Sequence, residues 1–191
     1  MSWLAILSSD ASAVIAASGL APLYPVSWKQ GIETVYARDA DQYVFVTPAI
    51  RGWTLVVGQW AGFWGIETII TDLSGRFHEV QAFATERIVE YHHWMLARDG
   101  QMLRSFAWLG ESIKVIKEIG QLTPIELALK IDPVIPKDHD AFSAEGDTFR
   151  PPNELYVMQV AGDWSINPTF LDDKTPAPGP GTLCTPATRP A

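Results

Sequence analysis

EVQAFATERIVEYHHWMLARDGQMLRSFAWLG, residues 79–110, is the stretch of sequence that decides the fold. Near its centre, Asp99-Gly100 separates two runs rich in Val, Tyr, Trp, Phe and Leu. Asp-Gly between two such runs is typical of a two-residue type I′ hairpin, because both central residues of that turn need a positive φ. The sequence therefore predicts a hairpin with strands over residues 88–98 and 101–109.

The turn also predicts how the two strands pair. With two turn residues and no bulge, Trp94 lies opposite Ser105. Phe106 and Trp108 then lie on the opposite face of the sheet from Trp94 and His92, since side chains alternate along a strand. Both faces are mainly apolar, so we expect the hairpin to lie in the middle of a sheet that is covered on both sides.

The rest of the chain alternates between strand and helix patterns. Apolar spacing and β-branched content predict further strands over residues 3–7, 43–47, 53–58, 80–85 and 113–119. Helices are predicted over residues 11–18, 28–37, 66–76, 124–130 and 154–161, with caps at Ser9 or Asp10, Ser27, Thr123 and Asn153. The prolines at 22 and 25 predict a connector. The fold class is α+β: a mostly antiparallel central sheet flanked by helices in a single domain over residues 1–171.

The C-terminal segment has a different composition. Residues 172–191, DDKTPAPGPGTLCTPATRPA, are rich in Pro, Gly and Thr and hold the only cysteine, Cys184. A segment of this kind buries too little apolar surface to order itself, so we expect a Pro-rich disordered tail. A single cysteine also cannot form an intramolecular disulfide, which suits a reducing compartment.

The net charge of the chain indicates which classes of partner it can bind. The 191 residues carry a net charge of −8, with a pI near 4.9. Nucleic-acid binding needs surfaces rich in Lys and Arg, so we expect no nucleic-acid partner. An acidic surface suits a basic protein partner, or it serves solubility alone.

The N-terminal segment is apolar but is not typical of a signal peptide. The first basic residue is Lys29, and polar residues at positions 8–10 interrupt the apolar run. No stretch reaches the roughly 18 apolar residues of a membrane span. We expect a cytoplasmic protein with no membrane partner.

The adjacent histidines are the first candidates for chemistry. Glu90, His92 and His93 form an E-x-H-H run, and His139-Asp140 lies further along the chain. Neighbouring residues of a strand point to opposite faces, so the two histidines cannot bind one ion together. We therefore expect hydrogen-bonded structural histidines and no metal or cofactor. A ligand pocket built on Glu90 and His92 is the alternative.

Motifs for other chemistry do not occur. No serine lies in a G-x-S-x-G turn, and the glycine-bearing stretches lack the Lys-Ser/Thr ending of a phosphate loop. We expect no enzymatic activity.

Two features indicate binding to a protein. Trp60 and Trp64 lie on a Gly-rich loop, where they form either an interface or a lid on the core edge. Residues 132–154 carry a net charge of −4, which is half of the chain's excess. This segment is either a solvated loop or an anionic patch for a basic partner. The predicted partner-binding residues are Trp60, Trp64, Asp138, Asp140, Glu145, Asp147 and Glu154.

Several phrases together resemble a widespread family of bacterial α+β proteins. They are VSWKQGIETVY (26–36), GWTLVVG (52–58), the long phrase EVQAFATERIVEYHHWMLARDGQMLRSFAWLGE (79–111) and VMQVAGDWSINP (157–168). The resemblance covers residues 1–171. Proteins of this type look similar to immunity proteins, which neutralise a toxin by binding it.

The resemblance implies a cytoplasmic immunity protein that binds a cognate antibacterial toxin and occludes its active site. The partner would present a basic surface. Two alternatives remain open: an enzyme or small-ligand binder that uses Glu90 and His92, and a structural adaptor.

Overall fold

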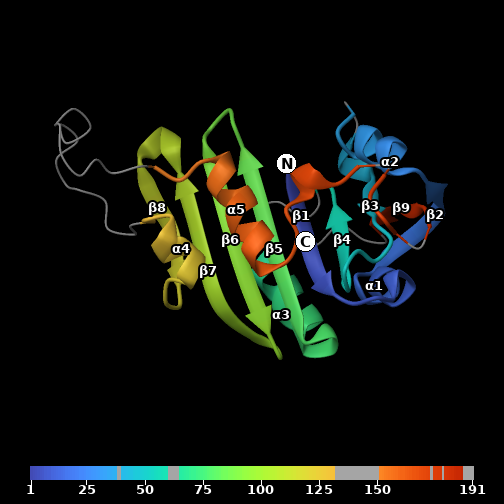
Figure 1. Cartoon of the computed structure of the whole chain (residues 1–191), viewed down its shortest axis with the longest axis horizontal. Helices are drawn as coiled ribbons and strands as arrows, with labels where there is room; N and C mark the ends of the chain where they lie inside the picture. The colour runs from blue at the N-terminus through green and yellow to red at the C-terminus, as the bar shows by residue number, and fades with distance from the viewer. Residues whose placement is uncertain (38–39, 60–64, 132–150, 173, 178, 187–191) are drawn as a thin grey trace.

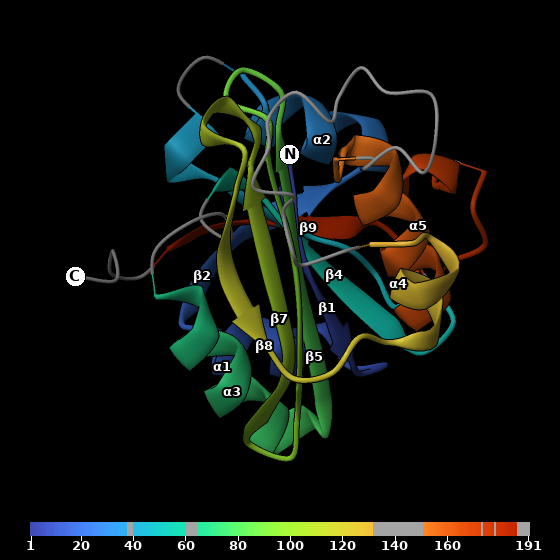
Figure 2. The ribbon, with the colours of Figure 1, turned by 90° about the vertical axis from the view of Figure 1, so that its left-hand side faces the viewer.

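A nine-stranded sheet runs through the whole molecule (Figure 1). The structure is a computed structural model that describes residues 1–37, 40–59, 65–131, 151–172, 174–177 and 179–186. All neighbouring strands of the sheet are antiparallel, and helices pack on both of its faces (Figure 2). The prediction of a single α+β domain with a central antiparallel sheet is confirmed.

The strands do not follow one another across the sheet in chain order. They are β1 (Ser2–Leu7), β2 (Leu20–Val26), β3 (Val44–Val46), β4 (Trp53–Val57), β5 (Glu79–Glu86), β6 (Tyr91–Arg98), β7 (Gln101–Leu109), β8 (Lys114–Ile119) and β9 (Gly181–Pro186). Their order across the sheet is β2-β9-β3-β4-β1-β5-β6-β7-β8. One half is thus a simple meander from β5 to β8, whereas the other half interleaves both ends of the chain.

Five α-helices among the described residues cover the sheet. They are α1 (Ala11–Ala17), α2 (Trp28–Val35), α3 (Ile66–Phe77), α4 (Pro124–Ala128) and α5 (Glu154–Trp164), with short 3-10 turns η1 (Ala40–Gln42), η3 (Gly110–Ser112) and η5 (Pro168–Phe170). The predicted caps at Asp10, Ser27, Thr123 and Asn153 are confirmed. In the part of the chain that the structure describes, no helix is long and apolar enough to cross a membrane.

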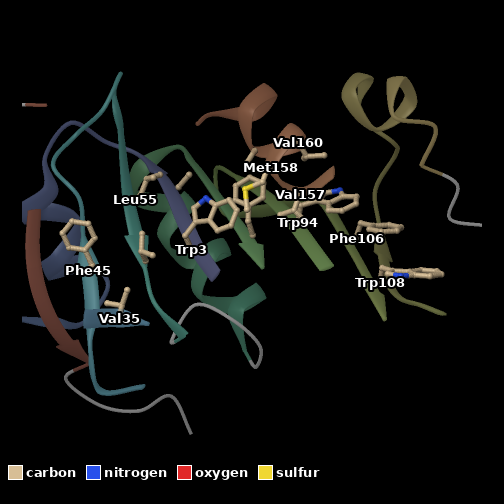
Figure 3. Close-up of a cluster of buried hydrophobic side chains, with 14 of the residues drawn as sticks. Trp3, Val35, Phe45, Leu55, Trp94, Phe106, Trp108, Val157, Met158 and Val160 are labelled. Carbon is tan, nitrogen blue, oxygen red and sulfur yellow. The ribbon is translucent and has the colours of Figure 1, made fainter. Parts of the chain in front are cut away.

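Each face of the sheet has its own hydrophobic core. On the side of α2, α4 and α5, aromatic side chains form a continuous layer that includes Trp3, Phe45 and Trp94 (Figure 3). On the side of α1 and α3, the core is aliphatic, with Ile6 and Ile70 fully buried. The prediction of a sheet covered on both sides is confirmed.

The β6–β7 hairpin turns where predicted, but its strands pair differently. Asp99 and Gly100 both have positive φ, at 50° and 78°. A β-bulge then adds one residue to β7, since Leu96 lies opposite Arg104 and not opposite Leu103. The predicted pairing of Trp94 with Ser105 is therefore wrong.

The bulge brings buried side chains of β7 onto the face of the sheet that α4 and α5 cover, which is also the face of Trp94. Trp94 pairs with Phe106, and the two rings stack with centroids 4.6 Å apart. Arg104 reaches the same face, where its Nε donates to Glu126 Oε1 of α4 at 2.9 Å. The indole Nε1 of Trp94 donates to the same oxygen at 2.7 Å. Both members of this ion pair are almost fully buried, so α4 is attached to the meander by charge as well as by packing.

The predicted connector around residues 22 and 25 is instead an edge strand. Strand β2 contains both prolines and pairs with β9 only, with an irregularity between Pro22 and Tyr24. Proline cannot donate a ladder hydrogen bond, and such residues are therefore confined to sheet edges. The prolines mark the strand as an edge, and they do not exclude it from the sheet.

The predicted disordered tail is wrong over residues 181–186, so the domain does not end at residue 171. Strand β9 lies between β2 and β3, and Leu183 and Cys184 are fully buried in the two cores. The short run Leu-Cys within a Pro-rich segment buries enough surface because both of its neighbouring strands are already in place. Helix α5 likewise continues past Gly162, where it was expected to end.

Candidate functional site

An acidic surface lies where β5 turns into β6. Residues 87–90 form this turn, and η3 lies beside it, because Gly110 N donates to Glu90 O at 3.0 Å. The start of β1 and the start of α5 lie at the same end of the sheet, at the top of Figure 1. We call the four side chains of Glu86, Ile88, Glu90 and Glu111 the acidic tip.

Ile88 is the apolar centre of the acidic tip. Its side chain is 91% exposed, more than any other large apolar side chain in the part of the chain that the structure describes. Its backbone N–H donates to Glu86 Oε1 at 3.2 Å, which holds the turn. A single exposed Ile is common on protein surfaces. An exposed Ile among three carboxylates on a hydrogen-bonded turn is a more specific arrangement.

Two of the carboxylates are held by the neighbouring turn. The Glu90 side chain packs so closely over Gly110 that a Cβ added there would overlap it. Glu111 follows directly, and its N–H donates to Val89 O at 3.4 Å. Glycine is therefore required at position 110, and the side chains of Glu90 and Glu111 come from connections that support each other.

Glu154 is the one predicted partner-binding residue that the structure describes. It begins α5 and forms a two-bonded ion pair with Arg87, in which Nη2 donates to Oε1 at 3.0 Å. The hydrogen bonds from Arg87 lower the pKa of Glu154 more than partial burial raises it. Glu154 thus ties α5 to the β5–β6 turn, and its charge is already compensated within the chain.

His92 lies behind the acidic tip. Its Nδ1 is 2.9 Å from Thr85 Oγ1. Burial lowers the pKa of His92, while the charges of Glu90 and Glu154 oppose that shift. Glu90 is therefore near enough to influence the charge of His92, although it lies in the turn with φ 48° and not in strand β6. A ligand pocket built on the two residues stays a prediction.

His93 lies on the other face of the sheet, as the alternation along β6 predicts. Its Nδ1 is 2.7 Å from the Tyr91 hydroxyl, and complete burial lowers its pKa to about 3. The two histidines do not face each other. Among the described residues, no group of three His, Cys, Asp or Glu side chains is placed to hold a metal ion.

The remaining predicted site residues lie outside the described residues. These are Trp60, Trp64, Asp138, Asp140, Glu145 and Asp147, together with His139 of the alternative metal site. The sequence predicts a strand over residues 88–98 and therefore does not predict Ile88 as an exposed turn residue, whereas β6 begins at Tyr91. The charged residues at positions 86, 87 and 90 were the available signal for a turn.

A comparison of the chain with protein-family models, with curated proteins and with solved structures found no match. The resemblance to a bacterial family therefore stays a prediction.

Proposed function

We propose that this chain is a cytoplasmic immunity protein that binds a cognate antibacterial toxin through its acidic tip and occludes the toxin's active site. The observation that carries the proposal is Ile88, which is 91% exposed on a turn whose neighbours are Glu86, Glu90 and Glu111. An apolar anchor with a charged rim is the arrangement found at the energetic centre of many protein interfaces.

The chemistry of the tip specifies the partner. Ile88 fits an apolar pocket, and the three carboxylates fit lysines or arginines around that pocket. The net charge of −8 speeds the encounter with a basic protein, because long-range attraction raises the association rate. The hydrogen bonds of the turn lower the entropy cost of binding, since they position the backbone of the contact residues before the partner binds.

The proposal is tested by capture of the partner. The tagged full-length chain is used to recover a stoichiometric partner from the native organism, and that partner is then expressed alone and together with this chain. A partner that is toxic alone and harmless in co-expression supports the proposal. A partner that is harmless alone contradicts it and favours the adaptor alternative.

The same assay tests the acidic tip directly. Ile88→Ala should weaken toxin binding by about 2 kcal/mol, roughly thirtyfold in Kd. Glu90→Gln with Glu111→Gln should mainly slow association and reduce its dependence on salt. Leu23→Ala, an exposed apolar side chain on the distant strand β2, is the control and should bind normally. Full affinity in Ile88→Ala would place the interface elsewhere.

An enzyme or ligand binder that uses Glu90 and His92 is the second candidate. It is favoured by one observation, the opposing effects of burial and of two carboxylates on the pKa of His92. His92→Asn tests the second candidate, because it removes the imidazole while the four side chains of the acidic tip are unchanged. Unchanged protection against the toxin by His92→Asn would exclude a chemical role for His92.

A further inference from the structure

A second surface feature lies beside the C-terminal half of α5 and also borders α4 through Ile125. It is a cleft of about 840 Å³ between the C-terminal half of α5, η5 and the turn that leads into β4. Its apolar lining consists of Ile50, Ile125, Met158, Ile166, Phe170 and Leu171. Met158 also packs in the aromatic core (Figure 3), so the floor of the cleft is fixed by the fold. The volume is that of a typical small-molecule site.

Two charged side chains line this cleft. They are Arg51, from the turn before β4, and Asp163, from α5. Arg51 is exposed, and within the described residues no carboxylate forms an ion pair with it. Gln159 and Asn167 also line the cleft and carry amide groups that can donate hydrogen bonds.

Arg51 holds an unfavourable backbone conformation. Ile50 and Trp53 exchange two backbone hydrogen bonds of 2.7 and 2.9 Å, which makes Arg51 and Gly52 the centre of a two-residue turn. Their φ angles are 52° and 86°. Gly, Asn or Asp is favoured at the first of these positions, and Arg is not. Residues kept in such conformations are concentrated at binding sites, where the side chain is needed.

We propose that this cleft binds a small amphipathic anion. The acid group lies on the guanidinium of Arg51, which can form two parallel hydrogen bonds with a carboxylate or sulfonate. The apolar part of the ligand lies on the floor formed by Ile125, Met158 and Ile166. The site is distinct from the acidic tip, so the proposal does not depend on toxin binding.

The proposal is tested with 8-anilinonaphthalene-1-sulfonate, an amphipathic anion whose fluorescence rises in an apolar site. The probe is titrated into the full chain at neutral pH, and decanoate is used to displace it. Arg51→Gln should weaken probe binding about tenfold, since it removes a charge-assisted hydrogen bond. Asp163→Asn should strengthen binding, because it removes a like charge. Arg76→Gln, an exposed arginine on α3 at the other face, is the matched control.

Two results would overturn the proposal. Equal probe affinity in Arg51→Gln and in the unaltered chain would remove Arg51 from the site. Displacement of the probe by decylamine as effectively as by decanoate would show that the cleft does not select an anion.

Arg51→Gly provides a second, independent readout. Glycine favours the left-handed backbone that position 51 requires, so this variant should raise the denaturation midpoint while it weakens probe binding. If Arg51 had only a structural role, its replacement would not raise the denaturation midpoint and weaken probe binding at the same time. A lower midpoint in Arg51→Gly would mean that the arginine is kept for the fold, and would contradict the proposal.

Discussion

The two halves of the sheet are built in different ways. From β5 to β8, each strand pairs with the next one along the chain, and the connections are short turns. On the other side of β1, β9 from the C-terminal region lies between β2 and β3. We call the first region the meander half and the second the interleaved half. Local pairs cost little loop-closure entropy, whereas the interleaved half must close very long loops.

The halves also differ in the interactions that stabilise them. The meander half contains the buried Arg104–Glu126 ion pair and the neutral buried His93. The interleaved half is apolar around Phe45, whose ring is enclosed by two glycines, Gly31 of α2 and Gly181 of β9. We therefore expect the meander half to respond to charge and pH, and the interleaved half to respond to chain connectivity and side-chain volume.

Removal of β9 should have the largest effect. A chain that ends at residue 178 loses buried Leu183 and Cys184 and leaves β2 without its neighbour in the sheet. We expect hydrogen exchange at Phe45 to become fast, while exchange at Trp94 in the meander half stays slow. Equal loss of protection at both positions would show that the halves fold as one unit.

The Arg104–Glu126 pair should be the most sensitive point of the meander half. Glu126→Leu removes the buried carboxylate and leaves the buried Arg104 guanidinium with only the more exposed Glu118 carboxylate, 3.5 Å from Nη1. We expect a cost of about 3–5 kcal/mol of unfolding free energy. Arg104→Met combined with Glu126→Leu should recover most of that loss, because two apolar side chains replace two charges. Urea denaturation of the single and double variants measures both effects, and a double variant no more stable than Glu126→Leu would contradict the argument.

Acid should weaken the meander half through His93. Its folded-state pKa of about 3 lies below the ordinary value of 6.5, so the unfolded chain binds more protons as the pH falls below 6.5. Stability should therefore decrease between about pH 6.5 and pH 3, by up to about 1.4 kcal/mol per pH unit. His93→Gln should flatten this dependence in denaturation curves recorded across that range. An unchanged slope would mean that other groups cause the acid sensitivity.

Two glycine-to-alanine substitutions should change the stability of the protein in opposite directions. A Cβ at Gly31 would overlap the buried Phe45 ring, so Gly31→Ala should cost about 1–3 kcal/mol despite the better helix propensity of alanine. At Gly75 in α3, the nearest atom to an added Cβ is the Gly100 Cα, 3.9 Å away. Gly75→Ala should therefore stabilise the protein by about 0.5–1 kcal/mol. Thermal denaturation of the two variants gives both values, and destabilisation by Gly75→Ala would contradict the propensity argument.

The meander half shows what sequence patterns predict well. The turn at Asp99-Gly100 within it and the cap at Thr123 just after it depend on residues within a few positions of each other. The bulge after Leu96 was not predictable from these rules. It is favoured by long-range packing, since it places Phe106 against Trp94 on the face covered by α5.

The interleaved half shows what such patterns miss. Strand β2 is hidden by its prolines and β9 by its Pro-rich surroundings. Strand β2 pairs with β9, and β9 pairs with β2 and β3, so both depend on partners that are distant in the sequence. The candidate site was missed for a related reason. Ile88 and Glu111 come from two separate connections, and the hydrogen bonds from Gly110 N to Glu90 O and from Glu111 N to Val89 O bring those connections together.

The position of β9 also sets an order of events during synthesis of the protein. Strand β2 leaves the ribosome early, but its neighbour in the sheet is encoded about 150 residues later. At typical rates of translation, roughly 8–30 s pass between the two. During that interval the edges of β2 and β3 that later pair with β9 are available to chaperones or to a neighbouring nascent chain. Strand β9 is thus made after β2 and β3, the two strands that it joins in the sheet.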